Sequence, residues 1–258
     1  MKVLSTLLKK EWLEAWRDKK LIWLPIAMSL LAISQPISLY YMPEILEAAG
    51  NLPEGAVIEL PVPTGEEVLA GTLSQFGILG TAIFILSVMG TISHERNSGV
   101  LPLLMTRPVN ALHYIGSKWV ANAVILLLSF IISYSLAYYY TNLLFNDVEL
   151  KRFLLSLAVY SIWILFTMTI TLFAGATFKK LGGIVGISIV FIATISVGTS
   201  LFPKFMGWSP GNVLNQASEV LMTGTFMESF GMMVIFSIIV IVCLFALTIY
   251  QFKRYESY

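Results

Sequence analysis

Six long apolar runs divide the chain, and none of them contains Lys, Arg, Asp, Glu or His. A hydrocarbon core about 30 Å thick needs roughly 20 residues of helix, so runs of this length predict membrane-spanning helices. We therefore expect an all-α membrane protein with six transmembrane helices, at residues 21–41, 71–93, 119–145, 153–178, 183–203 and 230–250. Twenty residues precede the first run and no small-residue cleavage site follows it, which favours a retained span over a signal peptide.

Composition supports a membrane location. The chain is 57% hydrophobic and 12% charged, whereas an ordinary soluble domain has roughly 25% charged residues. A net charge of +1 excludes a nucleic-acid binder, which would need clustered unopposed basic residues. The single cysteine, Cys243, lies inside an apolar run, so the sequence indicates neither a disulfide framework nor a Cys/His metal site.

The distribution of basic residues predicts the orientation of the chain in a cell membrane. Of the 16 Lys and Arg residues, only Lys151, Arg152 and Lys204 fall outside if the N-terminus is cytoplasmic. Basic residues near spans resist translocation, so we expect both termini in the cytoplasm. The segment 43–70 carries Glu residues and no base, and it is expected to be the main outer loop.

The first 20 residues, MKVLSTLLKKEWLEAWRDKK, alternate apolar and charged positions at helical spacing. Trp12 and Trp16 belong to the apolar side, and Arg17 belongs to the charged side. This pattern predicts an amphipathic helix that lies along the inner membrane interface. A generic basic flank of the first span is the alternative, but it would not explain the apolar stripe.

The connection 94–118, HERNSGVLPLLMTRPVNALHYIGSK, holds a short apolar cluster that includes Leu101 and Leu104. A solvated loop has no use for such residues, whereas a short cytoplasmic helix could insert them into a groove on another protein. Packing against the inner ends of the spans is the alternative. Glu95 is expected at the exposed rim of this surface, where its removal would cost at most about 1 kcal/mol.

The order of these features resembles the permease subunits of ABC transporters of the ABC-2 type. The chain has the KKEWLEAWRDKK helix before the first span, an ER-x-x-G-x-L-x-x-L-x-x-x-P connection after the second, and G-x-K before the third. The six-span layout and Ser209-Pro210 after the fifth span are similar too. The matching residues of the connection are Glu95, Arg96, Gly99, Leu101, Leu104, Pro108, Gly116 and Lys118.

The resemblance implies a single ABC-2 exporter-type transmembrane domain over residues 1–258, with an interfacial helix at 1–20. It implies a dimer with itself or a related permease, and two separate ATPase subunits. The connection 94–118 would form a coupling helix docked on an ATPase, and segment 204–229 would form short re-entrant helices at the outer mouth. A plain outer loop is the alternative for 204–229. The implied coupling residues are Glu95, Arg96, Gly99, Leu101, Leu104, Arg107 and Pro108.

The sequence carries no chemistry for catalysis. It has no G-x-x-x-x-G-K-[ST] phosphate loop, so ATP would be bound by the partner subunit, and we expect neither enzyme activity nor a cofactor in this chain. His94 and His113 lack the acidic or Cys neighbours of a metal site. Uncharged spans argue against an ion-coupled carrier and favour an amphiphilic or apolar substrate. The rival to an exporter is a membrane scaffold or sensor that binds a cytoplasmic regulatory partner.

The orientation leads to a labelling prediction. A Cys introduced at Glu54 or Glu66 is expected to react with an impermeant thiol reagent in intact cells, whereas a Cys at Arg107 is not, because basic segments stay in the cytoplasm. Cysteine labelling of intact and permeabilised cells measures this. Labelling at Arg107 from outside would reverse the orientation.

Overall fold

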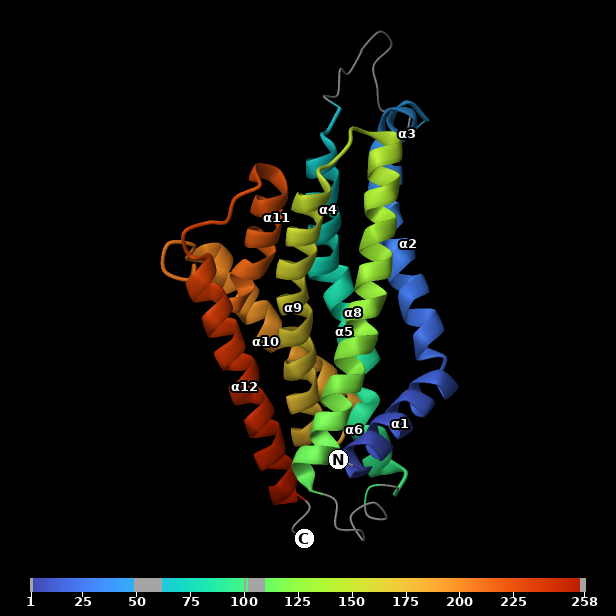
Figure 1. The fold of residues 1–258 in the computed structure, drawn as a ribbon, viewed down its shortest axis with the longest axis vertical. Helices are drawn as coiled ribbons and strands as arrows, with labels where there is room; N and C mark the ends of the chain where they lie inside the picture. The colour runs from blue at the N-terminus through green and yellow to red at the C-terminus, as the bar shows by residue number, and fades with distance from the viewer. Residues whose placement is uncertain (1, 49–61, 100, 102–109, 256–258) are drawn as a thin grey trace.

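The computed structural model describes residues 2–48, 62–99, 101 and 110–255, and these residues form helices and no strand. Figure 1 shows the long helices side by side along the longest axis, with the start of α1 and the end of α12 at one end of the bundle. We call this end the α1 end and the opposite end the α11 end.

Six helical stretches are long and apolar enough to cross a membrane, which confirms the six spans expected from the sequence. Several extend beyond the apolar runs, because polar and charged residues continue the helix at its ends. The second stretch combines four elements, and η1 among them is a π-helical turn. The stretches are α2 (Lys20–Tyr40), α4 to α6 (α4 Gly65–Gln75, η1 Phe76–Gly80, α5 Thr81–Val88, α6 Gly90–Asn97), α8 (Ala111–Leu144), α9 (Leu150–Thr177), α10 (Leu181–Leu201) and α12 (Phe230–Tyr255).

Short helices lie at both ends of the bundle. α1 (Lys2–Arg17) precedes α2 at an angle, and α3 (Met42–Ala48) follows α2 at the α11 end (Figure 1). Lys19 joins α1 to α2 with a left-handed φ of 53°, a conformation that side chains other than Gly, Asn and Asp rarely adopt. We call the turn at Asp18 and Lys19 the elbow.

The central helices are α8 and α9. In the most apolar 18-residue stretch of each helix, more than half of the residues are buried (56% in α8 and 61% in α9). Aromatic side chains fill the space between them. Phe130 stacks on Tyr160 with ring centroids 4.8 Å apart, and Tyr134 stacks on Phe153 at 5.0 Å. The Trp163 indole N–H donates to Thr81 Oγ1 at 3.0 Å and links α9 to α5. Large buried aromatic groups thus hold the middle of the bundle together.

The segment 204–229 is not a plain loop. It contains the 3₁₀ turn η2 (Pro210–Asn212) and helix α11 (Val213–Thr223), which packs against α9 and α4 (Figure 1). The buried Gln216 side chain accepts from the Met227 backbone N–H at 3.2 Å and donates to Ser229 Oγ at 3.3 Å. Gly224 ends α11 at a left-handed φ of 75°. The expectation that this segment re-enters the membrane at the outer mouth stays a prediction.

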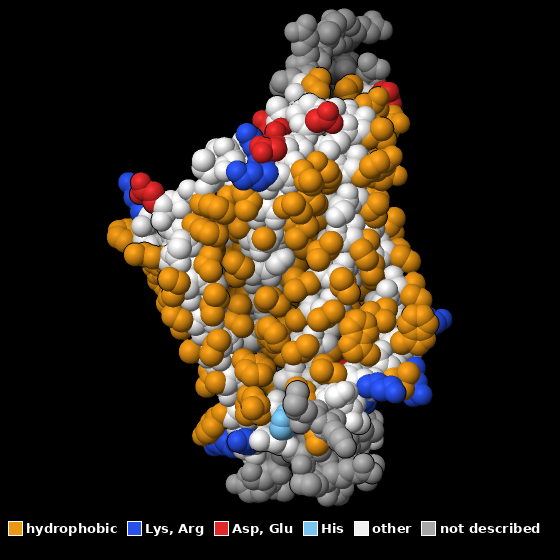
Figure 2. Space-filling view, in the orientation of Figure 1, with side chains coloured by type: hydrophobic (Ala, Val, Ile, Leu, Met, Phe, Trp, Pro, Cys, Tyr) orange, Lys and Arg blue, Asp and Glu red, His pale blue; other side chains and the backbone are white. Residues whose placement is uncertain are grey.

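The surface agrees with a membrane location. Figure 2 shows a broad band of hydrophobic side chains on the visible face, with charged side chains toward the two ends. Exposed apolar residues occur along α2, α10 and α12, for example Leu30, Val190 and Ile235. An aqueous solvent would disfavour such a band, whereas lipid chains cover it without cost.

The start of α4 gives a stability prediction. Gly65 donates its backbone N–H to Asn146 Oδ1 at 2.6 Å, and a Cβ on Gly65 would lie 2.6 Å from the Asn146 carbonyl oxygen. Gly65→Ala is therefore expected to destabilise the protein by about 1–3 kcal/mol. Gly116→Ala is the control, because nothing lies within 4 Å of its Cβ position and alanine favours a helix. Thermal unfolding of the purified protein in detergent measures both, and equal melting temperatures would contradict the prediction.

Candidate functional site

A group of charged side chains joins three helices at the α1 end. The Glu95 carboxylate of α6 accepts from the Tyr114 hydroxyl at 2.5 Å and from Lys118 Nζ at 2.8 Å, both on α8, and it also pairs with Lys10 of α1. Glu11 of α1 accepts from Lys118 at 3.0 Å and from Lys10 at 3.1 Å. We call Lys10, Glu11, Glu95, Tyr114 and Lys118 the ion cluster.

Helical spacing accounts for the placement of these groups. Tyr114 and Lys118 are four residues apart and so lie on one face of α8, toward α1 and α6. On α1, Glu11 lies between Leu7 and Ala15 at four-residue spacing, and all three side chains are buried. The inward face of α1 is therefore apolar with one carboxylate at its centre, and that carboxylate meets the buried ammonium of Lys118.

Charge balance is what makes this burial possible. Lys118 is 0% exposed and Glu95 is 4% exposed, and an unpaired charge at either position would cost several kcal/mol. Burial lowers the pKa of Lys10, but the Glu95, Glu11 and Glu14 carboxylates together raise it above its usual value. Lys10 thus stays protonated at neutral pH, and the cluster contains two ammonium groups beside two carboxylates.

The acids of the ion cluster, together with Glu14, are close enough to one another to be considered as ligands of a metal ion. Carboxylate oxygens of Glu11, Glu14 and Glu95 lie within 4.8 Å of one another. Lys10 Nζ forms ion pairs with all three, however, including Glu14 at 3.2 Å. A side-chain ammonium of the protein already takes the place that a cation would occupy.

Arg96 connects the same end of the bundle to α9. Its guanidinium donates to the carbonyl oxygens of Ala176 at 3.2 Å and Phe178 at 3.4 Å. These carbonyls belong to the carboxyl end of α9, where no further helical turn supplies a donor and where a cation is favoured. Glu95 and Arg96 therefore link α6 to three other helices, namely α1, α8 and α9.

The remaining residues of the predicted coupling set lie near the end of α6 or outside the described residues. Gly99 adopts a left-handed φ of 73° directly after α6, and Leu101 is 2% exposed. Leu104, Arg107 and Pro108 lie outside the described residues, so their role as coupling residues stays a prediction.

Two expectations about exposure are wrong. Glu95 does not lie on an exposed rim, because Lys10, Tyr114 and Lys118 surround its carboxylate, and the mild effect expected for Glu95→Ala does not apply to such a buried partner. Leu101 does not belong to an exposed apolar surface, since it packs into the core. On α1, Trp12, Trp16 and Arg17 are exposed, which is the placement that an interfacial helix requires.

Sequence reasoning missed Lys10, Tyr114 and Lys118 as partners of Glu95, and it missed Glu11 as the second carboxylate of the cluster. The sequence did contain one signal, since Glu11 interrupts the buried stripe of Leu7 and Ala15, and a carboxylate in an apolar face needs a buried cation. The residues near Glu11 in the sequence do not identify that cation, because Lys118 is 107 positions further along the chain.

Comparison with known proteins gives a consistent match. The profile of a family described as "ABC-2 type transporter" matches residues 2–210. The chain is also similar to the "Uncharacterized transmembrane protein YxlG" of Bacillus subtilis (strain 168), with 46% identity over 258 residues that cover 100% of both chains. The matched residues include the ion cluster and all of α1 to α10.

The ion cluster leads to a stability prediction. Lys118→Met leaves the buried Glu95 and Glu11 carboxylates short of a partner, at an expected cost of about 3–5 kcal/mol. The apparent melting temperature in detergent should fall by roughly 10 °C. Lys179→Met is the control, because Lys179 is exposed and forms no ion pair with any described residue.

A double variant separates lost charge balance from lost packing. Glu95→Gln combined with Lys118→Met removes one charge of each sign and should recover part of the stability lost in Lys118→Met alone. An unchanged melting temperature in Lys118→Met would show that the ammonium is not needed for the fold.

Proposed function

Because the chain belongs to the ABC-2 type transporter family, we propose that it is the permease of an exporter driven by a separate ATPase. The chain is a multi-pass membrane protein and a permease subunit of an ABC transporter. In the proposed assembly it pairs with a second copy or a related permease, and two ATPase subunits dock at the α1 end. The α1 end then faces the cytoplasm, in keeping with the basic residues expected there.

The arrangement of α6 carries the proposal for coupling. The ATPase would dock on the connection that follows α6 and precedes α8, and the ion cluster joins α6 to both α8 and α1. Breaking a buried charge pair costs about 3–5 kcal/mol, so these three helices resist separate movement. A displacement of the connection would therefore move α1, α6 and α8 together. This movement would change the access of the substrate to the bundle, at the place where α8 meets the neighbouring helices.

In this proposal, ATP is bound and hydrolysed by the partner subunits, and the permease itself needs no cofactor. The proposed substrate is amphiphilic or apolar. The charged residues of the described spans, including Glu95 and Lys118, lie toward the ends of the helices. The middle of the bundle consists of aromatic and aliphatic groups. A substrate with a strong net charge would find no counter-charge there.

The docking surface can be tested at Leu104. Leu104→Asp places a charge where an apolar contact with the ATPase is proposed, at a cost of a few kcal/mol, and should release the ATPase. Copurification of the permease with a co-expressed ATPase subunit measures retention, and protease protection in membrane vesicles measures insertion.

Val62→Asp is the matched control. Val62 is exposed near the α11 end, three residues before the start of α4, so the same chemical change there should leave the ATPase bound. Full retention by Leu104→Asp together with normal nucleotide turnover would contradict coupling through this connection, and it would favour the scaffold or sensor function.

A further inference from the structure

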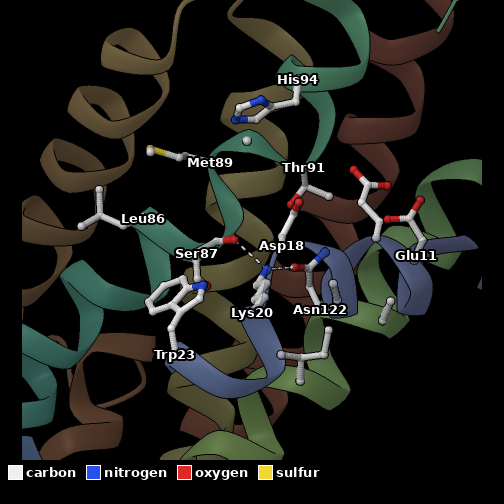
Figure 3. Close-up of a pocket in the computed structure, with 15 residues that line it drawn as sticks. Glu11, Asp18, Lys20, Trp23, Leu86, Ser87, Met89, Thr91, His94 and Asn122 are labelled. Atoms are coloured by element: carbon white, nitrogen blue, oxygen red, sulfur yellow. Dashed lines mark hydrogen bonds between the residues drawn. The ribbon is translucent and has the colours of Figure 1, made fainter. Parts of the chain in front are cut away.

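A pocket of about 390 Å³ opens at the α1 end between the elbow, α5, α6 and α8. Figure 3 shows its lining side chains, with Lys20 between Ser87 and Asn122 and with Asp18 in the same pocket. The pocket borders the ion cluster, since Glu11 belongs to both.

Lys20 provides a cation in this pocket without an anionic partner. Its Nζ donates to the Ser87 carbonyl oxygen at 2.6 Å and to Asn122 Oδ1 at 2.6 Å, and both acceptors are neutral. In the described part of the chain, no carboxylate oxygen lies within the 4.0 Å of an ion pair with Lys20. An ammonium carries three N–H donors, so a third remains for an anionic ligand.

Asp18 provides the opposite charge two residues earlier. Its carboxylate is exposed and forms no ion pair with any described residue. The left-handed Lys19 lies between Asp18 and Lys20 at the elbow. Both side chains line the pocket, and the Asp18 carboxylate attracts the Lys20 ammonium without a contact short enough for an ion pair. Glu14 lines the same pocket and adds a second carboxylate, which Lys10 already neutralises at 3.2 Å. The pocket therefore offers a cation whose hydrogen-bond acceptors are both neutral, and an acidic side.

The opposite wall of the pocket is apolar and continues onto the lipid-facing surface. Trp23 of α2 and Leu86 of α5 line the pocket, and they are 40% and 51% exposed. Both belong to helices that cross the membrane, near the end where α1 lies. A ligand in the pocket would thus contact charged groups on one side and acyl chains on the other, which is the position of a phospholipid headgroup.

We propose that this pocket binds the headgroup of a zwitterionic phospholipid with a primary ammonium, namely phosphatidylethanolamine. The phosphate accepts from Lys20, and the ammonium donates to Asp18, which forms no ion pair with any described residue. Lys10 and Lys118 already neutralise Glu14 and Glu11. A lipid with only negative charge would bring no ammonium to the remaining carboxylate, Asp18, and is therefore disfavoured. A choline headgroup lacks N–H donors for the carboxylates, so it forms the weaker complex.

The lipid site is independent of the proposed function. It depends on the pocket and on the membrane location of the chain, and it holds whether or not an ATPase docks on the connection after α6. Failure of one proposal therefore leaves the other standing.

Native mass spectrometry of the purified full chain in detergent tests the site, with phosphatidylethanolamine, phosphatidylcholine and phosphatidylglycerol as probes. We expect phosphatidylethanolamine to bind most tightly. Lys20→Met should raise its Kd about tenfold, the equivalent of one charged hydrogen bond. Asp18→Asn should raise the Kd about threefold, since an exposed ion pair contributes less, and should remove the preference over phosphatidylcholine.

Lys19→Gln is the matched control, because it removes a neighbouring positive charge that does not line the pocket, and it should bind lipid like the original chain. Lys20→Arg keeps the cation and should retain binding, which separates loss of charge from misfolding in Lys20→Met. Equal lipid binding by all variants, or tightest binding of phosphatidylglycerol, would overturn the proposal. So would soluble phosphoethanolamine binding as tightly as the lipid, because the ligand would then not be a membrane component.

Discussion

A buried ammonium in a medium of low dielectric must be neutralised, and Lys118 imposes this constraint on the α1 end of the protein. Its side chain is fully buried, so its stability depends on the Glu95 and Glu11 carboxylates at 2.8 and 3.0 Å. These two acids come from α6 and α1, and each must approach α8 closely. The angle at which α1 folds back on the spans follows from this requirement, together with the apolar contacts of Leu7 and Ala15.

The middle of the bundle is held by a different interaction. Aromatic stacking between α8 and α9 replaces ion pairs there, and buried hydroxyl groups such as Ser129 and Thr171 donate to carbonyls of their own helix. Such local bonds satisfy the hydroxyl without joining helices. The charged interactions at the α1 end therefore connect helices that could otherwise slide past one another.

The elbow places two chemical environments side by side. On one side of α1, Glu11 and Lys10 belong to a charge-balanced cluster that excludes a metal ion, because an ammonium already lies among the acids. On the other side, Asp18 and Lys20 face a pocket without pairing with each other. The difference arises from helix geometry. Side chains four residues apart on α1 share a face and meet α8, whereas the left-handed Lys19 turns the chain and separates its neighbours.

The sequence by itself determined the membrane class, the six spans and the family resemblance, because hydrophobic runs and the order of short motifs are local properties of the chain. It also predicted an amphipathic first helix with Trp12 and Trp16 on its apolar side. The environment of Glu95 was decided by the tertiary structure alone. Its partners Lys10 and Lys118 are 85 and 23 positions away, and a carboxylate next to a loop looks exposed until the helices that bury it are in place. The sequence placed Asp18 and Lys20 in the predicted interfacial segment 1–20, and only the fold brought both into the lining of one pocket, since burial and pairing depend on helices that meet through packing.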